Sequence, residues 1–181
     1  MEVQFFDIEG LALLQSKKFE DERGYFFESF NQKQFNAAIG KEILFVQDNV
    51  SISKKNVIRG IHLQLPPSAQ GKLVRVIRGK ALDVAVDIRK NSPTYGKHVS
   101  IELSEENGRF FWIPEGFAHG FCALEENTIF TYKCTNFYDP KAEIGIRFDD
   151  PDLGIIWPTN QPIVNKKDCD NLLFHNFASP F

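Results

Sequence analysis

Residues 80–88 read Lys-Ala-Leu-Asp-Val-Ala-Val-Asp-Ile, and this stretch is the clearest guide to the fold class. Large apolar side chains occupy the even positions, whereas alanines and aspartates fill the odd positions between them. A period of two is that of a β-strand, because successive side chains point to opposite faces of a sheet. The stretch therefore predicts a strand, and much of the chain around it follows the same period.

Further strands are indicated on both sides of this one, with Gly, Asn or Pro at the turns between them. Strands at this spacing are typical of an antiparallel sandwich or barrel, so we predict an all-β fold. One short helix is expected at Asn31–Ile39, and residues 159–181 are expected to form a tail that packs over the domain. The other predicted strands are Ile43–Ser53, Val57–Gln64, Leu73–Arg78, Val99–Leu103, Phe110–Ile113, Phe117–Leu124 and Thr128–Cys134.

Length and composition limit the class of protein. A chain of 181 residues suits a single domain, and 43% hydrophobic with 25% charged residues argues against disorder. The net charge of −3 disfavours nucleic acid and anionic membranes as partners. Three cysteines without a C-x-x-C pair argue against a disulfide framework or a zinc site. With no signal peptide and no long apolar run, we expect a cytoplasmic protein.

Charge and polarity are unevenly distributed along the chain. Asn49–Leu82 contains seven cations and no acid, which indicates either a site for a small anion or a solvated basic face. Within Ile43–Ser53, Leu44, Val46, Val50 and Ile52 share one face, and polar side chains share the other. A polar face on a barrel strand meets solvent or lines an internal cavity, and we expect solvent as the commoner case.

Two histidines stand in motifs that could carry chemistry. His62 follows the basic residue Arg59 within RGIHLQ, and His119 lies in PEGFAHG. A histidine that acts as a general base needs a partner that fixes its tautomer. Tyr132 is a possible acid, although a buried tyrosine is more often a core residue. The sequence does not choose among the candidate carboxylates Asp48, Asp83, Asp87 and Asp168.

Taken together, these segments resemble the dTDP-4-dehydrorhamnose 3,5-epimerase family of the cupin superfamily. The resemblance extends from about residue 7 to 170, and the tail after Asp168 departs from the family pattern. Many short motifs in the same order are far more specific than any one alone. They are DERGYFFE at 21–28, QDN at 47–49, RGIHLQ at 59–64, PPSAQGKL at 66–73, PEGFAHGF at 114–121, YKCT at 132–135, Tyr138, Glu143, Asp150-Pro151, Trp157-Pro158 and Lys167-Asp168.

The resemblance implies a single cupin-type jelly-roll β-barrel with short peripheral helices, its active site inside the barrel, and a homodimer. It implies that His62 is the base, Asp168 its partner, Tyr132 the acid on the opposite face, and Lys72 the group that stabilises an enolate. Arg23 and Glu28 would reach the nucleotide from the neighbouring subunit, and Tyr138 would stack on the thymine. The substrate-binding residues implied are Arg23, Phe26, Glu28, Gln47, Asn49, Arg59, His119, Tyr138, Glu143 and Lys167.

The implied reaction inverts C3 and C5 of dTDP-4-dehydro-6-deoxy-glucose to give dTDP-4-dehydro-rhamnose, within dTDP-rhamnose biosynthesis for lipopolysaccharide and O-antigen. Both carbons flank the 4-keto group, so a base, an opposite acid and a cation suffice, and no cofactor or metal is expected. Three alternatives stay open: a C3-only epimerase, a metal-dependent cupin, and a non-catalytic nucleotide-sugar-binding cupin. The metal cupin is disfavoured because Gln64 occupies a position where a ligand histidine is expected.

Overall fold

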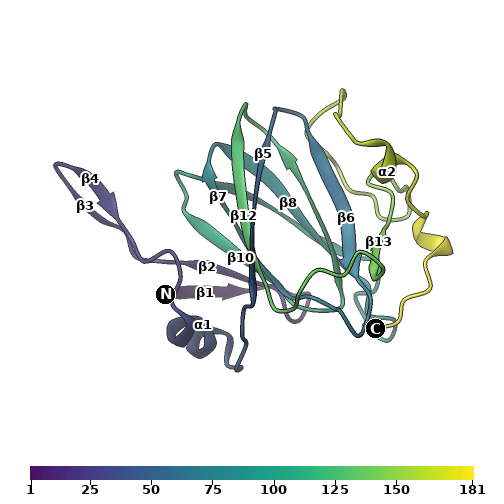
Figure 1. The fold of residues 1–181 in the computed structure, drawn as a ribbon, viewed down its shortest axis with the longest axis horizontal. Coiled ribbons are helices and arrows are strands. Elements are labelled where there is room, and N and C mark those ends of the chain that lie inside the picture. The colour runs from purple at the N-terminus through teal and green to yellow at the C-terminus, as the bar shows by residue number, and fades with distance from the viewer.

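Two antiparallel sheets face each other in the computed structural model, which describes residues 1–181 (Figure 1). The six-stranded sheet has the order β1-β2-β10-β7-β12-β5, and the five-stranded sheet the order β13-β6-β11-β8-β9. The all-β jelly-roll prediction is confirmed. The strands are β1 (Glu2–Phe5), β2 (Ala12–Gln15), β5 (Gln47–Ser53), β6 (Ile58–Gln64), β7 (Lys72–Arg78), β8 (Lys80–Asp87), β9 (His98–Ser104), β10 (Arg109–Ile113), β11 (Phe117–Ala123), β12 (Thr128–Cys134) and β13 (Glu143–Gly145).

Most predicted elements agree with the structure to within about a residue, and the exception is the start of β5. Strand β5 begins at Gln47 instead of Ile43, because its partner β12 ends at Cys134, directly opposite Gln47. The predicted helix is α1 (Gln32–Ile39), with Asn31 as its N-cap. The Asn31 side chain accepts a hydrogen bond from the backbone N–H of Gln34, which satisfies one of the free N–H groups of the first turn.

Three apolar layers hold the sheets together. The first fills the space between the two sheets and includes Val74, Phe121 and Phe130. The second lies on the outer face of the five-stranded sheet, where the C-terminal segment brings Phe177 and Phe181 against it. The third lies between α1 and the six-stranded sheet. Helices α2 (Lys166–Cys169) and η1 (Phe174–Asn176) lie in this C-terminal segment, beside β13 in Figure 1.

The expectation for the polar face of Ile43–Ser53 is wrong. Gln47 and Asn49 line an internal cavity, and Ser53 is 2% exposed. The apolar face of the same strand is the outer one, where Val50 is 67% and Ile52 62% exposed. In β5 the polar face is therefore turned inward and the apolar face outward, the opposite of an ordinary core strand, because the barrel interior beside β5 is polar.

Two glycines let β6 and β11 approach closely beside His62 and His119. A Cβ atom on Gly60 would lie 2.5 Å from the Cα atom of Gly120, and Gly60 has a φ of +132°. The register of the two strands shifts between His119 and Phe121, and His62 lies directly opposite His119. The contact therefore places the two histidines on neighbouring strands at one level of the barrel.

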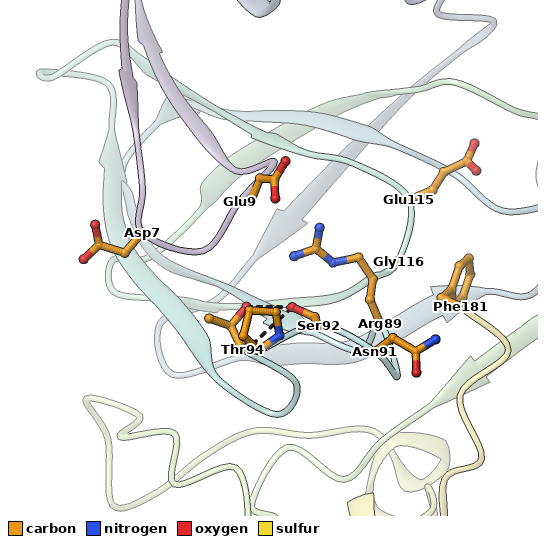
Figure 2. Close-up of a pocket in the computed structure, with 10 residues that line it drawn as sticks. Asp7, Glu9, Arg89, Asn91, Ser92, Thr94, Glu115, Gly116 and Phe181 are labelled. Atoms are coloured by element: carbon orange, nitrogen blue, oxygen red, sulfur yellow. Dashed lines mark hydrogen bonds between the residues drawn. The ribbon is translucent and has the colours of Figure 1, made fainter.

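A buried carboxylate at the end of β8 binds the loop that follows this strand. Asp87 accepts hydrogen bonds from Arg89, Ser92 and Thr94, at 2.6–2.7 Å for the shortest bond to each. Burial opposes ionisation of Asp87, but these donors outweigh it and lower the pKa to about 2. The side chains of Arg89, Ser92 and Thr94 line an open pocket that shares no residue with the internal cavity (Figure 2).

A small hairpin projects away from the two sheets at the upper left of Figure 1. It consists of β3 (Phe19–Asp21) and β4 (Gly24–Phe26), which pair only with each other. Phe19 is 56% and Phe26 70% exposed. None of the helices is long and apolar enough to cross a membrane.

Candidate active site

The internal cavity consists of two adjoining compartments that share part of their lining. A compartment of about 350 Å³ is lined by Gln47, Gln70 and Tyr138 among others, and one of about 210 Å³ by Arg59 and His119 among others. Three side chains line both parts, and they are His62, Lys72 and Tyr132. These three are the residues in which the resemblance places a base, an enolate stabiliser and an acid.

Strand periodicity explains why these side chains meet. Lys72 has the same parity as Val74 and Val76, which belong to the apolar layer between the sheets. Tyr132 likewise follows Phe130, whose ring stacks on Phe121 with centroids 4.1 Å apart. Alternate residues share a face, so the inward face of each of these two strands carries apolar core residues along one part of its length and a polar cavity residue further along. The cavity is the polar continuation of the core.

His62 and Asp168 form a buried pair. His62 Nε2 lies 2.7 Å from Asp168 Oδ1, and the backbone N–H of Gly60 donates to Asp168 Oδ2 at 3.3 Å. Burial opposes ionisation of Asp168, but these hydrogen bonds outweigh it and lower its pKa. With Asp168 ionised, Nε2 carries the donated proton, and Nδ1 of His62 is left free to accept one.

The helix α2 delivers Asp168 to this position. Asn165 caps the helix, and its Oδ1 accepts from the backbone N–H of Asp168 at 2.7 Å. Asp168 is fully buried, whereas the His62 side chain is 26% exposed. The buried carboxylate is thus held in place, and the His62 ring in front of it remains accessible from the cavity.

Lys72 and Tyr132 both have pKa values shifted by burial. Burial lowers the pKa of Lys72, and the nearby Cys134, Asp83 and Glu143 offset part of that effect. Burial also raises the pKa of Tyr132, so its phenol stays protonated at neutral pH. A protonated phenol can donate a proton, as a general acid must.

The polar substrate-binding candidates form a chain of hydrogen bonds across the cavity. Gln47 donates to Asn49 Oδ1 at 3.0 Å, and Gln47 Oε1 accepts from the backbone N–H of Tyr138 at 2.9 Å. The Tyr138 hydroxyl donates to Glu143 at 2.8 Å, and Lys167 donates to the same Glu143 oxygen. These contacts lower the pKa of Glu143 despite its partial burial. Five of the predicted residues are therefore physically linked.

Arg59 and His119 face the smaller compartment. Arg59 donates through Nε to Ser53 Oγ at 3.2 Å, which holds its guanidinium at the cavity edge. His119 Nε2 lies 2.9 Å from Asp83 Oδ2, and its ring is 6.1 Å from that of Phe130. Of the seven cations in Asn49–Leu82, only Arg59 and Lys72 line the cavity. The other five cations of the segment therefore lie outside the cavity.

Four predicted binding residues lie outside the cavity of their own chain, and one of them, Lys167, reaches it only through its contact with Glu143. Arg23 pairs with Asp21 at 2.6 Å at the tip of the hairpin, and its side chain is 85% exposed. Phe26 is also exposed, and Glu28 accepts hydrogen bonds from Asn31 and Gln34 near α1. None of the four lines either compartment.

Some cavity residues were not predicted from the sequence. These residues are Ser51, Gln70 and Asn165. The signal for Asn165 was its spacing, since an Asn three residues before an acidic residue is a helix N-terminal pattern. No group of three or more His, Cys, Asp or Glu side chains is arranged to hold a metal ion.

Known proteins are similar to this chain in sequence and in fold. The family model described as dTDP-4-dehydrorhamnose 3,5-epimerase matches residues 6–176. An enzyme of that name from Shigella flexneri is 52% identical over 93% of this chain and 93% of its own length. The crystal structure of a dTDP-6-deoxy-D-glucose-3,5-epimerase from Legionella pneumophila, in complex with dTDP-4-keto-L-rhamnose, matches with a TM-score of 0.94 and 45% identity, covering 98% of this chain and 94% of that chain.

A relative with a narrower activity is less similar. A dTDP-4-dehydrorhamnose 3-epimerase from Streptomyces niveus is 37% identical over 96% of this chain and 84% of its own length. Both the family model and the relative from Shigella flexneri carry the 3,5-epimerase description, and they cover nearly all of this sequence. The chain therefore belongs to the dTDP-4-dehydrorhamnose 3,5-epimerase family.

Proposed function

We propose that this chain inverts C3 and C5 of dTDP-4-dehydro-6-deoxy-glucose, with His62 as the base and Tyr132 as the acid. Family membership supports the activity, that of a dTDP-4-dehydrorhamnose 3,5-epimerase (EC 5.1.3.13) in dTDP-rhamnose biosynthesis. The ligand in the Legionella pneumophila complex, dTDP-4-keto-L-rhamnose, has the chemistry of the proposed product. The assignment of individual roles rests on the geometry of the cavity.

The observation that carries the mechanism is the placement of base and acid on opposite sheets. His62 stands on β6 of the five-stranded sheet, and Tyr132 on β12 of the six-stranded sheet. Both line the same cavity. A sugar ring held between them presents one face to each group, and inversion requires that a proton leave one face and return to the other.

The chemistry then needs a third group for the charge that develops. His62 Nδ1 removes the proton from the carbon next to the 4-keto group, and the electron pair moves onto O4 to give an enolate. Lys72, whose ammonium also lines the cavity, stabilises that oxyanion. Tyr132 returns a proton from the opposite face, and Asp168 stabilises the imidazolium of His62 during the step.

Solvent exchange tests the proposal directly. We expect the enzyme, incubated with the 4-keto substrate in deuterated water, to incorporate one deuteron at C3 and one at C5 with inversion at both. Proton NMR counts the lost C–H signals and reports the configuration. Deuterium at C3 alone would show a C3-only epimerase. Binding without any exchange would show a nucleotide-sugar-binding protein and overturn the proposed activity.

The active form in this proposal is a homodimer in which the hairpin of each subunit completes the nucleotide site of the other. Arg23 and Phe26 are exposed and lie outside their own cavity, as such a crossing requires. The outer face of β5 and β7 exposes Val50, Ile52 and Ile77, which supports an apolar contact with a second copy. The dimer contact would thereby cover the exposed apolar face of β5.

Arg23→Ala tests this arrangement. We expect the Michaelis constant to rise by about tenfold to a hundredfold, because a hydrogen bond to a charged group contributes about 1.5–3 kcal/mol. Turnover at saturation should change little, since Arg23 is remote from the sugar. Lys17→Ala, which removes another exposed cation before the same hairpin, should leave the Michaelis constant unchanged. An active monomer in sedimentation at assay concentration would contradict the crossing.

A further inference from the structure

Both legs of the projecting hairpin are anchored where it leaves the sheets (Figure 1). Lys18 directly precedes β3, and Phe27 directly follows β4. The ammonium group of Lys18 donates to the backbone oxygen of Glu106 at 2.7 Å and to that of Glu105 at 3.4 Å. It also lies 4.6 Å from the centre of the Tyr25 ring in the second leg. Because β3 and β4 pair only with each other, such root contacts decide where the hairpin points.

The loop that receives Lys18 is itself held by hydrogen bonds. The backbone N–H of Ser104 donates to Asn107 Oδ1, and the backbone N–H of Asn107 donates to Ser104 Oγ, each at 3.1 Å. Asn107 Nδ2 also donates to the backbone oxygen of Glu102 at 3.0 Å. A Cβ atom on Gly108 would lie 2.8 Å from Lys18 Cε, so the glycine leaves room for the lysine side chain. The loop is therefore a fixed support for the ammonium group.

The second leg is attached to the six-stranded sheet through Arg75 on β7. The guanidinium carbon of Arg75 lies 4.9 Å from the ring centres of both Phe27 and Phe110. Phe110 is a buried residue of β10, and Arg75 Nε is buried without a hydrogen-bond partner. A guanidinium stacks favourably on aromatic faces, so Arg75 joins the Phe27 ring to a ring of the core.

Lys18 differs in these contacts from its neighbour Lys17. Lys18 is half-buried and reaches both the loop and the second leg, since its ammonium group also lies 6.0 Å from the centre of the Phe27 ring. Lys17 is exposed, and its ammonium group lies 5.2 Å from the Phe19 ring without a hydrogen bond to the loop. Of these two adjacent cations, Lys18 is thus the one that connects the hairpin to the body of the chain.

We propose that Lys18 is a positioning residue, which fixes the direction of the hairpin and so places Arg23 and Phe26 in the nucleotide site of the second copy. The inference rests on the proposed function, in which the hairpin crosses between subunits. Arg23 hydrogen-bonds Asp21 within the same hairpin, so the direction of the tip is set at the root. An arm that is already in place loses less conformational entropy when the nucleotide sugar binds.

Lys18→Met removes the ammonium group and keeps an unbranched side chain. We expect the Michaelis constant for the 4-keto nucleotide sugar to rise about tenfold, because the hydrogen bond that orients the hairpin is lost. Turnover at saturation should stay at the wild-type value, since the cavity is unchanged. Lys18→Arg, which keeps a cationic donor, should restore most of the affinity. An unchanged Michaelis constant in Lys18→Met would overturn the proposal, and so would a loss confined to turnover.

Lys17→Met is the matched control. It removes the adjacent cation but none of the contacts with the loop, so its Michaelis constant should equal that of the wild type. An equal rise in both variants would assign the effect to the charge of this segment and contradict the proposal. Sedimentation should show the same assembly for both variants and the wild type. Dissociation of Lys18→Met alone would assign its effect to assembly and would likewise contradict a positioning role.

A double-mutant cycle identifies the group through which Lys18 acts. In an Arg23→Ala background, Lys18→Met should raise the Michaelis constant by a smaller factor than in the wild type, because the side chain that it positions is gone. Full additivity of the two effects would refute the link between the root and the tip.

Backbone dynamics test the anchor without any turnover. Nitrogen-15 relaxation of the amides in residues 19–26 should give lower order parameters in Lys18→Met than in the wild type or in Lys17→Met. Unchanged order parameters would refute the anchor. An enzyme that shows no solvent exchange at C3 or C5, but whose hairpin loosens in Lys18→Met, would disprove the proposed function and leave the anchoring role of Lys18 intact.

Discussion

His62→Ala is expected to abolish both solvent exchange and inversion, because no enolate forms without the base. General-base assistance contributes about 10²–10⁴-fold to a rate, so turnover should fall by at least that range. The side chain is partly exposed to the cavity, and alanine there leaves the strand pairing of β6 intact. The measurement is proton NMR of the 4-keto substrate in deuterated water, with loss of both C–H signals followed over time.

His175→Ala is the control for this variant. His175 lies in the C-terminal segment, with its side chain 59% exposed and 3.5 Å from Asp152, and it lines neither cavity compartment. It should exchange and invert at the wild-type rate. Asp168→Asn should fall between the two, since it disturbs the tautomer of His62 without removing the ring. A His62→Ala enzyme that inverts either carbon at near wild-type rate would remove the basis of the mechanism.

Tyr132→Phe should separate exchange from inversion. The ring remains, so the packing against Phe130 and the shape of the cavity are kept, as are the base and Lys72. Deuterium should still enter the substrate from the side of His62, where the proton left. Inversion should drop by about 10²–10⁴-fold, because the opposite face has lost its proton donor.

Tyr95→Phe provides the comparison for that loss of a phenol. Tyr95 packs on Phe174 with centroids 5.1 Å apart and lines neither cavity compartment. Its variant should invert normally. If Tyr132→Phe also inverted normally, the acid would be a different group, and His119 would be the next candidate because it lines the same compartment.

The fold class could be predicted from periodicity, but the orientation of one strand could not. In β8 the period of two correctly indicates a strand. In β5 the same period gave the wrong direction for the polar face, since alternation defines two faces without saying which faces inward. The barrel interior is polar at this end, so Asn49 points in and Val50 points out.

The partner of His62 shows a different limit of sequence reasoning. Four carboxylates were candidates, and the structure gives each its own contact: Asp168 pairs with His62, Asp83 with His119, Asp87 with Arg89 and Asp48 with Lys133. These pairings depend on register between strands and on the path of the tail. Only the family resemblance, which membership in the family now confirms, singled out Asp168.

The origin of Asp168 in the C-terminal segment bears on how the enzyme is made. Asp168 follows His62 by 106 residues, and chains are synthesised from the N-terminus at about 5–20 residues per second. The histidine therefore leaves the ribosome roughly 5–20 seconds before its carboxylate. A nascent or prematurely released chain that ends before α2 has the barrel strands but an unoriented imidazole. Under the proposed mechanism, full catalytic competence thus arises late in translation, when α2 has been made.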